Sequence, residues 1–351
     1  MKDIIVLFFL SLLFSWVLIF VFSKLFYRLN FLDNPKKYGL KRSAIPYSMG
    51  VVFFINFFVL SSFFVDYNYK LMIMIVFGFI ITILSFLDDF FDINPKIRLF
   101  FQILIGFVIA LSSIKIGYVS NIFGGIIDLQ THYLDIFSYR IYYIPILFSV
   151  FWYVLIFNAL NWSDGVPGLT SGLSFISFFI IFLLGLKLYF VDDYEGGIKN
   201  AYFIMQVSVI LLASLGVFWF FDSREKFLMG DSGTMFLGFM LATIAIVSGG
   251  KIATVAVVFG IYLIDAFYVI LKRIINKKNP LKKDFTHMHH RLEKVGLERK
   301  QILILLYSLS AFFGLASLFL DKMGKIFVFI LLIFIVVFIN ILLDKIKFGK
   351  K

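Results

Sequence analysis

The sequence predicts an all-α integral membrane protein that crosses the bilayer many times, with its N-terminus outside and its C-terminus in the cytoplasm. Of its 351 residues, 61% are hydrophobic and 15% are charged, whereas a soluble domain is about 45–50% apolar and about 25% charged. Long apolar runs recur along the chain, and Lys and Arg gather in alternate loops between them. These observations exclude a soluble or disordered protein.

Eleven apolar runs are long enough, at about 20 residues, to cross roughly 30 Å of hydrocarbon as helices. The first is too long and too apolar for a cleaved signal peptide, and Lys24 and Arg28 follow it, so we expect it to remain attached. Only Gly249, Gly250 and Lys251 separate the eighth run from the ninth, so ten spans are the alternative. The expected spans are residues 4–23, 46–65, 71–87, 97–116, 142–160, 173–190, 201–221, 234–249, 252–271, 301–320 and 326–343.

Basic residues predict the orientation. Of the 33 Lys and Arg residues, 24 lie in one set of alternate loops and nine on the other side. Because cytoplasmic loops are rich in Lys and Arg, the net charge of +12 is an orientation signal and gives little reason to expect a nucleic-acid partner. No linker or repeat divides the chain, which predicts a single membrane domain over residues 1–351. Its expected cytoplasmic loops are residues 24–45, 88–96, 161–172, 222–233 and 272–300, and they would hold any site on that face.

The longest expected outside loop, residues 117–141, contains alternating stretches around Gly124 and Gly125. This pattern predicts a short β-hairpin.

Carboxylates and histidines carry the candidate chemistry, because a chain without cysteine has no disulfide, thiolate or Cys-based metal site. Asp88, Asp89 and Asp92 directly follow the third run, although charges are costly near hydrocarbon. On a continued helix, Asp88 and Asp92 would share one face with Asp89 beside them. Clustered carboxylates repel one another unless a cation neutralises them, and oxygen ligands favour Mg²⁺ or Mn²⁺. The alternative is a solvated acidic turn.

The end of the fifth run forms a second polar cluster. Asn158 and Asn161 would lie on one helical face and lead to Asp164 in a turn rich in glycine. Glycines let the backbone approach a ligand closely. The stretch is equally typical of an ordinary helix stop.

The residues before the eighth run form a third cluster, Gly230-Asp231-Ser232-Gly233. Asp231 or Ser232 could be a simple N-cap. Free amides at a helix N-terminus also bind phosphate, and an Asp there can hold a metal that bridges to it.

The fourth cluster comprises His287, His289, His290 and Arg291. Without cysteines or a helical His-Glu motif, this grouping favours an anionic phosphate ligand over zinc. Asp265 lies about 10 Å inside the ninth run, where a functional or paired role is expected for a charge.

Together these clusters indicate phosphoryl or phosphosugar transfer onto a lipid, because acidic groups can hold a metal and basic groups can hold phosphates at a membrane surface. No Gly-x-x-x-x-Gly-Lys-Ser/Thr loop is present, so use of ATP or GTP is not supported.

The sequence resembles the polyprenyl-phosphate N-acetylhexosamine-1-phosphate transferase family (glycosyltransferase family 4) over nearly its whole length. His287-Met288-His289-His290 is similar to the branch that transfers simple N-acetylhexosamine phosphates, whereas pentapeptide translocases carry three consecutive histidines. The motifs of the resemblance are Asp33-x-Pro35, Ile45-Pro46, Met49-Gly50, Asp88-Asp89-x-x-Asp92, Asn158 to Leu169, Met229 to Thr234 and Pro280 to Gly296.

The resemblance implies transfer of an N-acetylhexosamine-1-phosphate, with UDP-N-acetylglucosamine or a close relative as the donor, to undecaprenyl phosphate at the inner membrane. UMP would be released, and the lipid-linked sugar would initiate a cell-envelope polysaccharide. Mg²⁺, or Mn²⁺ in its place, would be the cofactor, the active site would face the cytoplasm, and a homodimer is consistent with the family.

The resemblance also suggests roles for individual residues. Asp88 or Asp89 would position or deprotonate the lipid phosphate, and Asp231, Asp164 and Asp89 would bind metal. Substrate contacts would come from Asn158, Asn161, Asp92, His287, His289, His290, Arg291, Lys41 and Arg42.

Two departures from the family pattern and two rival classes remain open. Pro167 stands where the pattern Asp-Gly-x-Asp-Gly has its second Asp, and Met49 stands where Gly is common. A transporter or flippase is the main alternative, but it would place polar groups near the bilayer midplane. A CDP-alcohol phosphotransferase is less consistent, because its longer Asp-Gly-Ala-Arg pattern is missing.

Overall fold

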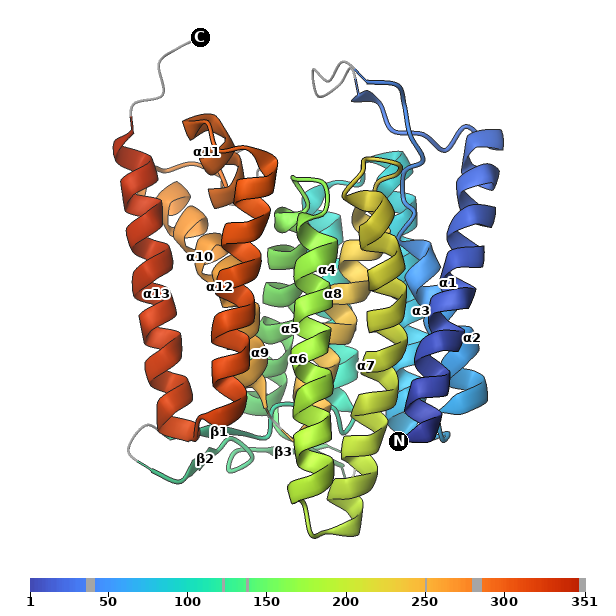
Figure 1. Ribbon diagram of the computed structural model, residues 1–351. Coiled ribbons are helices and arrows are strands. Elements are labelled where there is room, and N and C mark those ends of the chain that lie inside the picture. Colours follow the sequence, from blue (N-terminus) through green and yellow to red (C-terminus); the bar gives the residue numbers. More distant parts are fainter. Residues whose placement is uncertain (36–41, 122–123, 137–138, 250, 280–285, 347–351) are drawn as a thin grey trace. The chain divides into compact units, whose positions relative to one another are not determined.

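The computed structural model describes residues 1–35, 42–121, 124–136, 139–249, 251–279 and 286–346. Nearly all of its regular structure is helical, as the sequence predicts (Figure 1). The chain divides into two compact units, each assembled from separate stretches. The first unit comprises residues 1–94 and 167–240, and the second comprises residues 95–166 and 241–351.

Within the described residues, eight helices are long and apolar enough to span a membrane, and a bent pair would make a ninth. The protein is therefore a multi-pass membrane protein. Two further expected spans coincide with the shorter helices α2 and α4, of 14 and 17 residues. The total of eleven spans and the orientation of the termini stay predictions.

The first unit is built around α7 (Glu195–Asp222), which contacts α1 (Lys2–Arg28), α2 (Val51–Phe64) and α6 (Leu169–Val191). It also contains α3 (Tyr69–Phe91) and the start of α8 (Gly230–Val247). Buried polar groups join three of these helices, because Ser11 donates to the Ile210 carbonyl at 2.8 Å and Asn56 donates to Ser11 at 2.7 Å. These bonds satisfy polar groups inside an otherwise apolar core.

The second unit contains α4 (Pro95–Leu111), which packs on α5 (Tyr143–Ser163), and the end of α8. Helices α9 (Ile252–Val258) and α10 (Gly260–Ile275) meet at 77°. The span expected at residues 252–271 therefore coincides with a pair of helices that bend at Phe259. The remaining helices are α11 (Met288–Val295), α12 (Arg299–Phe319) and α13 (Lys322–Lys345).

Two small antiparallel hairpins precede α5. The first joins β1 (Tyr118–Ser120) to β2 (Ile126–Asp128), which confirms the hairpin predicted around Gly124 and Gly125. The second joins β3 (Leu134–Ile136) to β4 (Tyr139–Ile141) and was not predicted.

Candidate active site

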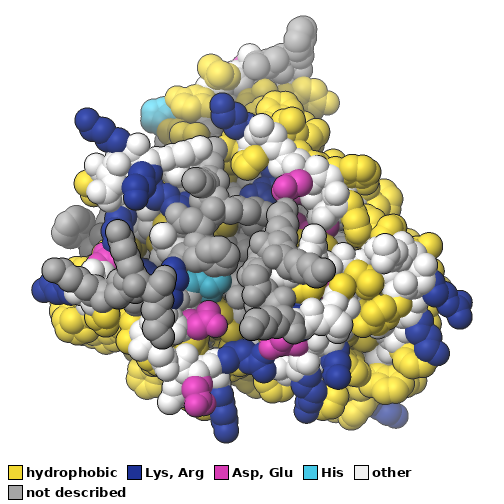
Figure 2. Space-filling view, turned by 90° about the horizontal axis from the view of Figure 1, so that it is seen from above, with side chains coloured by type: hydrophobic (Ala, Val, Ile, Leu, Met, Phe, Trp, Pro, Cys, Tyr) yellow, Lys and Arg dark blue, Asp and Glu magenta, His cyan; other side chains and the backbone are white. Residues whose placement is uncertain are grey.

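The described residues predicted for the site fall into two clusters, one in each unit. Figure 2 shows the end of the helices where Lys and Arg (dark blue), Asp and Glu (magenta) and His (cyan) are exposed among hydrophobic side chains.

The acidic motif at the end of α3 does not share one helical face. The helix ends at Phe91, and Asp92 adopts a left-handed conformation with φ 49° while its N–H donates to the Asp88 carbonyl. The expectation that Asp88 and Asp92 lie on one face is therefore wrong, because the chain leaves the helix between them. Asp88 is buried, and its Oδ1 accepts the Ile93 N–H at 2.8 Å.

Asp89 caps the N-terminus of α8. Its Oδ1 accepts the Asp231 N–H at 2.7 Å, and its Oδ2 accepts the Ser232 N–H at 3.2 Å. The first amides of a helix need such acceptors. The cap thus comes from α3 instead of from Asp231 or Ser232 themselves, and it holds Asp231 close to the acidic end of α3.

Ser48 completes this arrangement from the segment before α2. Its hydroxyl donates to Asp89 Oδ2 at 2.5 Å and lies 2.8 Å from the Ser232 hydroxyl. Ser48 has a φ of 64°, a conformation that side chains rarely adopt and that persists only where the surroundings enforce it. The enforcement comes from its neighbours, because the Met49 and Gly50 N–H groups donate to the carbonyls of Leu228 and Met229.

The first loop contributes a fixed basic group. Arg42 donates to both carboxylate oxygens of Asp33, at 3.1 and 2.7 Å, and Asp33 also accepts the Ile45 N–H. Such a bidentate pair fixes the guanidinium plane. Lys41, which was predicted to act beside Arg42, lies outside the described residues.

In the second unit, the end of α5 carries the two asparagines. Asn158 donates to Gln102 of α4 at 2.7 Å and to the Val154 carbonyl at 2.8 Å. Asn161 is buried at 8% exposure. The partners of Asn158 show that it also joins α5 to α4.

The turn after α5 meets the histidine cluster at Gly165. A Cβ added to Gly165 would lie 2.4 Å from His289 Nε2 and 2.6 Å from the His290 ring. The second and fourth predicted motifs therefore meet within one unit, as a shared ligand would require. Only a glycine allows this approach.

His289 is completely enclosed, and its Nε2 has no hydrogen-bond partner among the described residues. Burial, together with the nearby His290, His287 and Arg291, holds the pKa of His289 well below its usual value. The ring is therefore neutral at pH 7. A buried nitrogen without a partner calls for a ligand, a water or an ion.

The other members of the histidine cluster have internal partners. His287 Nδ1 lies 2.9 Å from Asp265 Oδ2, which confirms the paired role expected for Asp265. Arg291 lies 3.0 Å from Asp344 and 3.4 Å from Asp265, and it also donates to Asn340. These bonds indicate that Arg291 ties α11 to α10 and α13. Its predicted contact with substrate phosphate stays a prediction.

The Asn158-to-Leu169 stretch is divided between the units. Its last part begins α6 in the first unit, where buried Asp222 accepts from the Gly168 N–H at 3.1 Å and the Ser171 hydroxyl at 2.5 Å. Asp222 and Ser48 are not among the residues predicted from the sequence. Asp222 gave the same signal as Asp88, an acid directly after an apolar run, whereas the strained Ser48 gave none.

The donors at the start of α8 fit Mg²⁺. Asp89 and Asp231 are close enough to interact electrostatically, and the Ser48 and Ser232 hydroxyls lie beside them. Within the described ranges, no group of three His, Cys, Asp or Glu side chains could hold a metal ion. Mg²⁺ usually takes one or two carboxylates together with substrate phosphates. The arrangement therefore suits a metal shared with a substrate.

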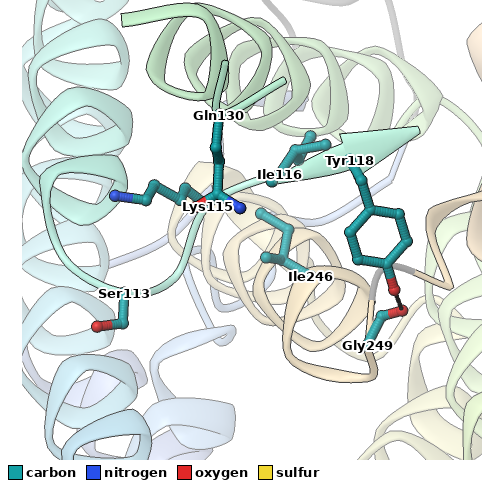
Figure 3. Close-up of a pocket in the computed structure, with 8 residues that line it drawn as sticks. Ser113, Lys115, Ile116, Tyr118, Gln130, Ile246 and Gly249 are labelled. Atoms are coloured by element: carbon teal, nitrogen blue, oxygen red, sulfur yellow. Dashed lines mark hydrogen bonds between the residues drawn. The ribbon is translucent and has the colours of Figure 1, made fainter. Parts of the chain in front are cut away.

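A cavity of about 430 Å³ lies elsewhere in the second unit (Figure 3). Lys115, Gln130 and Ile246 line it, and the Tyr118 hydroxyl donates to the Gly249 carbonyl at its edge. None of the predicted site residues lines this cavity, so it is separate from the candidate active site.

The chain is a multi-pass membrane protein in which acidic groups gather around the N-terminus of α8. The chain belongs to glycosyl transferase family 4, whose model matches residues 71–249. This membership confirms the resemblance to the polyprenyl-phosphate N-acetylhexosamine-1-phosphate transferases.

Similar proteins cover most of the chain. A probable undecaprenyl-phosphate N-acetylglucosaminyl 1-phosphate transferase of Bacillus subtilis (strain 168) is 26% identical over 98% of this chain and 92% of its own length. Two phospho-N-acetylmuramoyl-pentapeptide-transferases, of Borreliella burgdorferi (strain ZS7) and Borreliella afzelii (strain PKo), are 27% and 26% identical. Each of these alignments covers 82% of this chain and 84% of the relative.

Proposed function

We propose that the protein transfers an N-acetylhexosamine-1-phosphate, with GlcNAc-1-phosphate as the first choice, from a UDP-sugar to undecaprenyl phosphate. The acidic cap of α8 carries this proposal, because Asp89 holds Asp231 and a helix N-terminus close to Asp88. Family membership and the names of the relatives support a sugar-1-phosphate transferase that uses a polyprenyl phosphate.

In the proposed reaction, an oxygen of the lipid phosphate attacks the β-phosphorus of the UDP-sugar. The bond between that phosphorus and the bridging oxygen breaks, and UMP leaves with the oxygen. Both substrates are anionic, so cationic groups must offset their repulsion.

Asp231 is assigned to Mg²⁺ or Mn²⁺, with Asp164 and Asp89 as further ligands. The metal would neutralise charge on the donor diphosphate. Asp88 or Asp89 would position or deprotonate the lipid phosphate, and both carboxylates already accept backbone hydrogen bonds in the first unit. A phosphate monoester has a second pKa near 6, so positioning matters more than proton removal.

The remaining roles concern binding. Asn158 and Asn161 would contact the donor, and the group of His287, His289, His290 and Arg291 would hold its diphosphate. Asp92 would also bind substrate, and Lys41 and Arg42 are the candidates for binding the lipid phosphate. We also propose that the protein lies in the inner membrane, that its active site faces the cytoplasm and that it forms a homodimer.

UMP release tests this function. Purified protein with undecaprenyl phosphate, Mg²⁺ and UDP-GlcNAc should release UMP, and a chelator should stop the release until Mg²⁺ is restored. Asp88→Asn and Asp231→Asn should abolish it without lowering expression. Asp135→Asn is the matched control, because Asp135 is an exposed hairpin residue paired with Arg140, and it should retain full activity.

Two outcomes would reverse the proposal. Normal turnover in both Asp88→Asn and Asp231→Asn would reject the site assignment. Substrate-dependent lipid transport without UMP release would favour the transporter class instead. A panel of UDP-sugars that includes UDP-MurNAc-pentapeptide identifies the donor and tests whether Pro167 alters its choice.

A further inference from the structure

Asp265 is a buried carboxylate that has no assigned part in the proposed reaction. It lies in α10 at 2% exposure, within an apolar segment where an unpaired charge is costly. Its partners described above, His287 and Arg291, both lie in the histidine segment, residues 287–291. This pattern indicates a link between α10 and that segment.

Both oxygens of Asp265 face the start of α11. Oδ2 lies 2.9 Å from His287 Nδ1, and the Met288 N–H donates to both oxygens at 3.1 Å. The N-cap residue of α11 is His287, which makes no side-chain cap of its own. Asp265 therefore supplies the missing cap from a different helix.

The contact also selects a nitrogen of His287. An ionised carboxylate can only accept a hydrogen bond, so the hydrogen in this bond belongs to His287 Nδ1. Any further proton exchanged with a ligand must then be carried by Nε2. The Trp162 and His287 rings stack with their centroids 5.6 Å apart and 26° between their planes, which limits rotation of the His287 ring.

We propose that Asp265 is a positioning residue that keeps His287 Nδ1 occupied and thereby makes Nε2 the nitrogen through which His287 binds the donor. The proposal rests on the proposed function, because it takes His287 as a contact of the donor diphosphate. Asp265 itself touches no substrate and acts through His287 and the start of α11.

Nitrogen-15 NMR of the full-length protein, labelled at its four histidines, tests the tautomer without any substrate. His287→Gln assigns the signals. In the native protein, His287 should carry its hydrogen on Nδ1, and Asp265→Ala should move it to Nε2. A native His287 protonated on Nε2, or an unchanged spectrum in Asp265→Ala, would overturn the proposal.

Asp344→Asn is the matched control for this measurement. It removes the carboxylate 3.0 Å from Arg291 without touching His287, so the His287 tautomer should stay as in the native protein. A change as large as that of Asp265→Ala would show that general loosening of α11 explains the result, which would also overturn the proposal.

Kinetics provide the second test. Asp265→Ala should lower kcat/KM for UMP release about 10- to 100-fold, the usual loss when an orienting partner is removed. The double variant Asp265→Ala/His287→Gln should fall no further than His287→Gln alone, whereas multiplied losses would refute action through His287.

Asp265→Asn covers the case in which Asp265→Ala fails to fold, because it keeps the size and shape of the side chain. Oδ1 of Asp265 faces the Met288 N–H and Arg291, so the amide oxygen should take that place and the amide NH2 should donate to His287 Nδ1. The hydrogen of His287 should then move to Nε2, and activity should fall. If the native protein releases no UMP, the proposed function fails, while the NMR result still decides the role of Asp265.

Discussion

At Gly165, the absence of a single Cβ atom allows the histidine rings to approach the turn after α5. Its missing Cβ leaves room for the rings of His289 and His290. The side chains of this cluster therefore depend on one residue that carries no functional group.

Gly165→Ala should lower kcat/KM for UMP release by about 10-fold or more. The added methyl group would lie 2.4 Å from His289 Nε2, and a misplacement of about 1 Å in a site can cost about 100-fold. The measurement is the UMP assay with thermal unfolding in parallel. Gly216→Ala is a control for altered backbone freedom, since an added Cβ there would meet only Phe175, at an ordinary contact distance of 3.5 Å. Equal activity in Gly165→Ala and the native protein would contradict the packing argument.

His289 should make the α11 segment sensitive to acid. Because its pKa is lowered in the folded protein, protonation favours opening. Its contribution to stability is present above the unfolded pKa of about 6.5 and is lost as the pH falls below that value. Hydrogen exchange of residues 286–295 should accelerate relative to α12 below about pH 6.5. His289→Asn should remove this pH dependence, and an identical profile in that variant would exclude His289 as its source.

At the scale of elements, the cap of α8 by Asp89 joins two motifs that lie far apart in sequence. Three donors converge on one carboxylate. Loss of Asp89 should therefore lower stability, whereas loss of Asp231 should lower activity.

Asp89→Asn should destabilise the first turn of α8 by about 1–2 kcal/mol, because its amide cannot accept all three hydrogen bonds. Asp231→Asn should abolish activity with little change in stability. Hydrogen exchange at residues 231–236 and thermal unfolding measure the difference. Ser48→Ala should destabilise the same turn by less than Asp89→Asn, since it removes only one of the three donors. Equal stability in Asp89→Asn and the native protein would argue against the cap.

The bend between α9 and α10 is a second feature at this scale. Phe259 lies between the two helices, and Gly260 begins α10, where an added Cβ would lie 2.6 Å from Leu332 of α13. Apolarity predicted a span here but not its bend, because hydropathy carries no information about the direction of a helix.

At the scale of the whole molecule, the Lys and Arg asymmetry predicts the topology. The absence of cysteine makes this simple to test, since single cysteines can be introduced without a background. Thr131→Cys in the hairpin region and Lys226→Cys before α8 occupy exposed positions.

In intact cells, a membrane-impermeant maleimide should label Thr131→Cys and not Lys226→Cys. Permeabilised cells should show labelling of both, which serves as the control for reactivity. The reverse pattern would invert the predicted orientation, since the positive-inside rule places basic loops in the cytoplasm.

The sequence by itself determined the helical membrane architecture, the family and the polar motifs, because long apolar runs and clustered acids are local properties. It could not show that Asp92 leaves the α3 helix or that α9 and α10 bend apart. The sequence also could not show which residues far apart along the chain contact one another.

Only the tertiary structure decided which motifs touch. It placed Asp89 on the amides of α8, Gly165 against the histidines and Asp265 under His287. Each of these contacts depends on how helices pack and where their termini meet. The sequence therefore predicts which residues carry the chemistry, and the packing shows that several of them hold others in place.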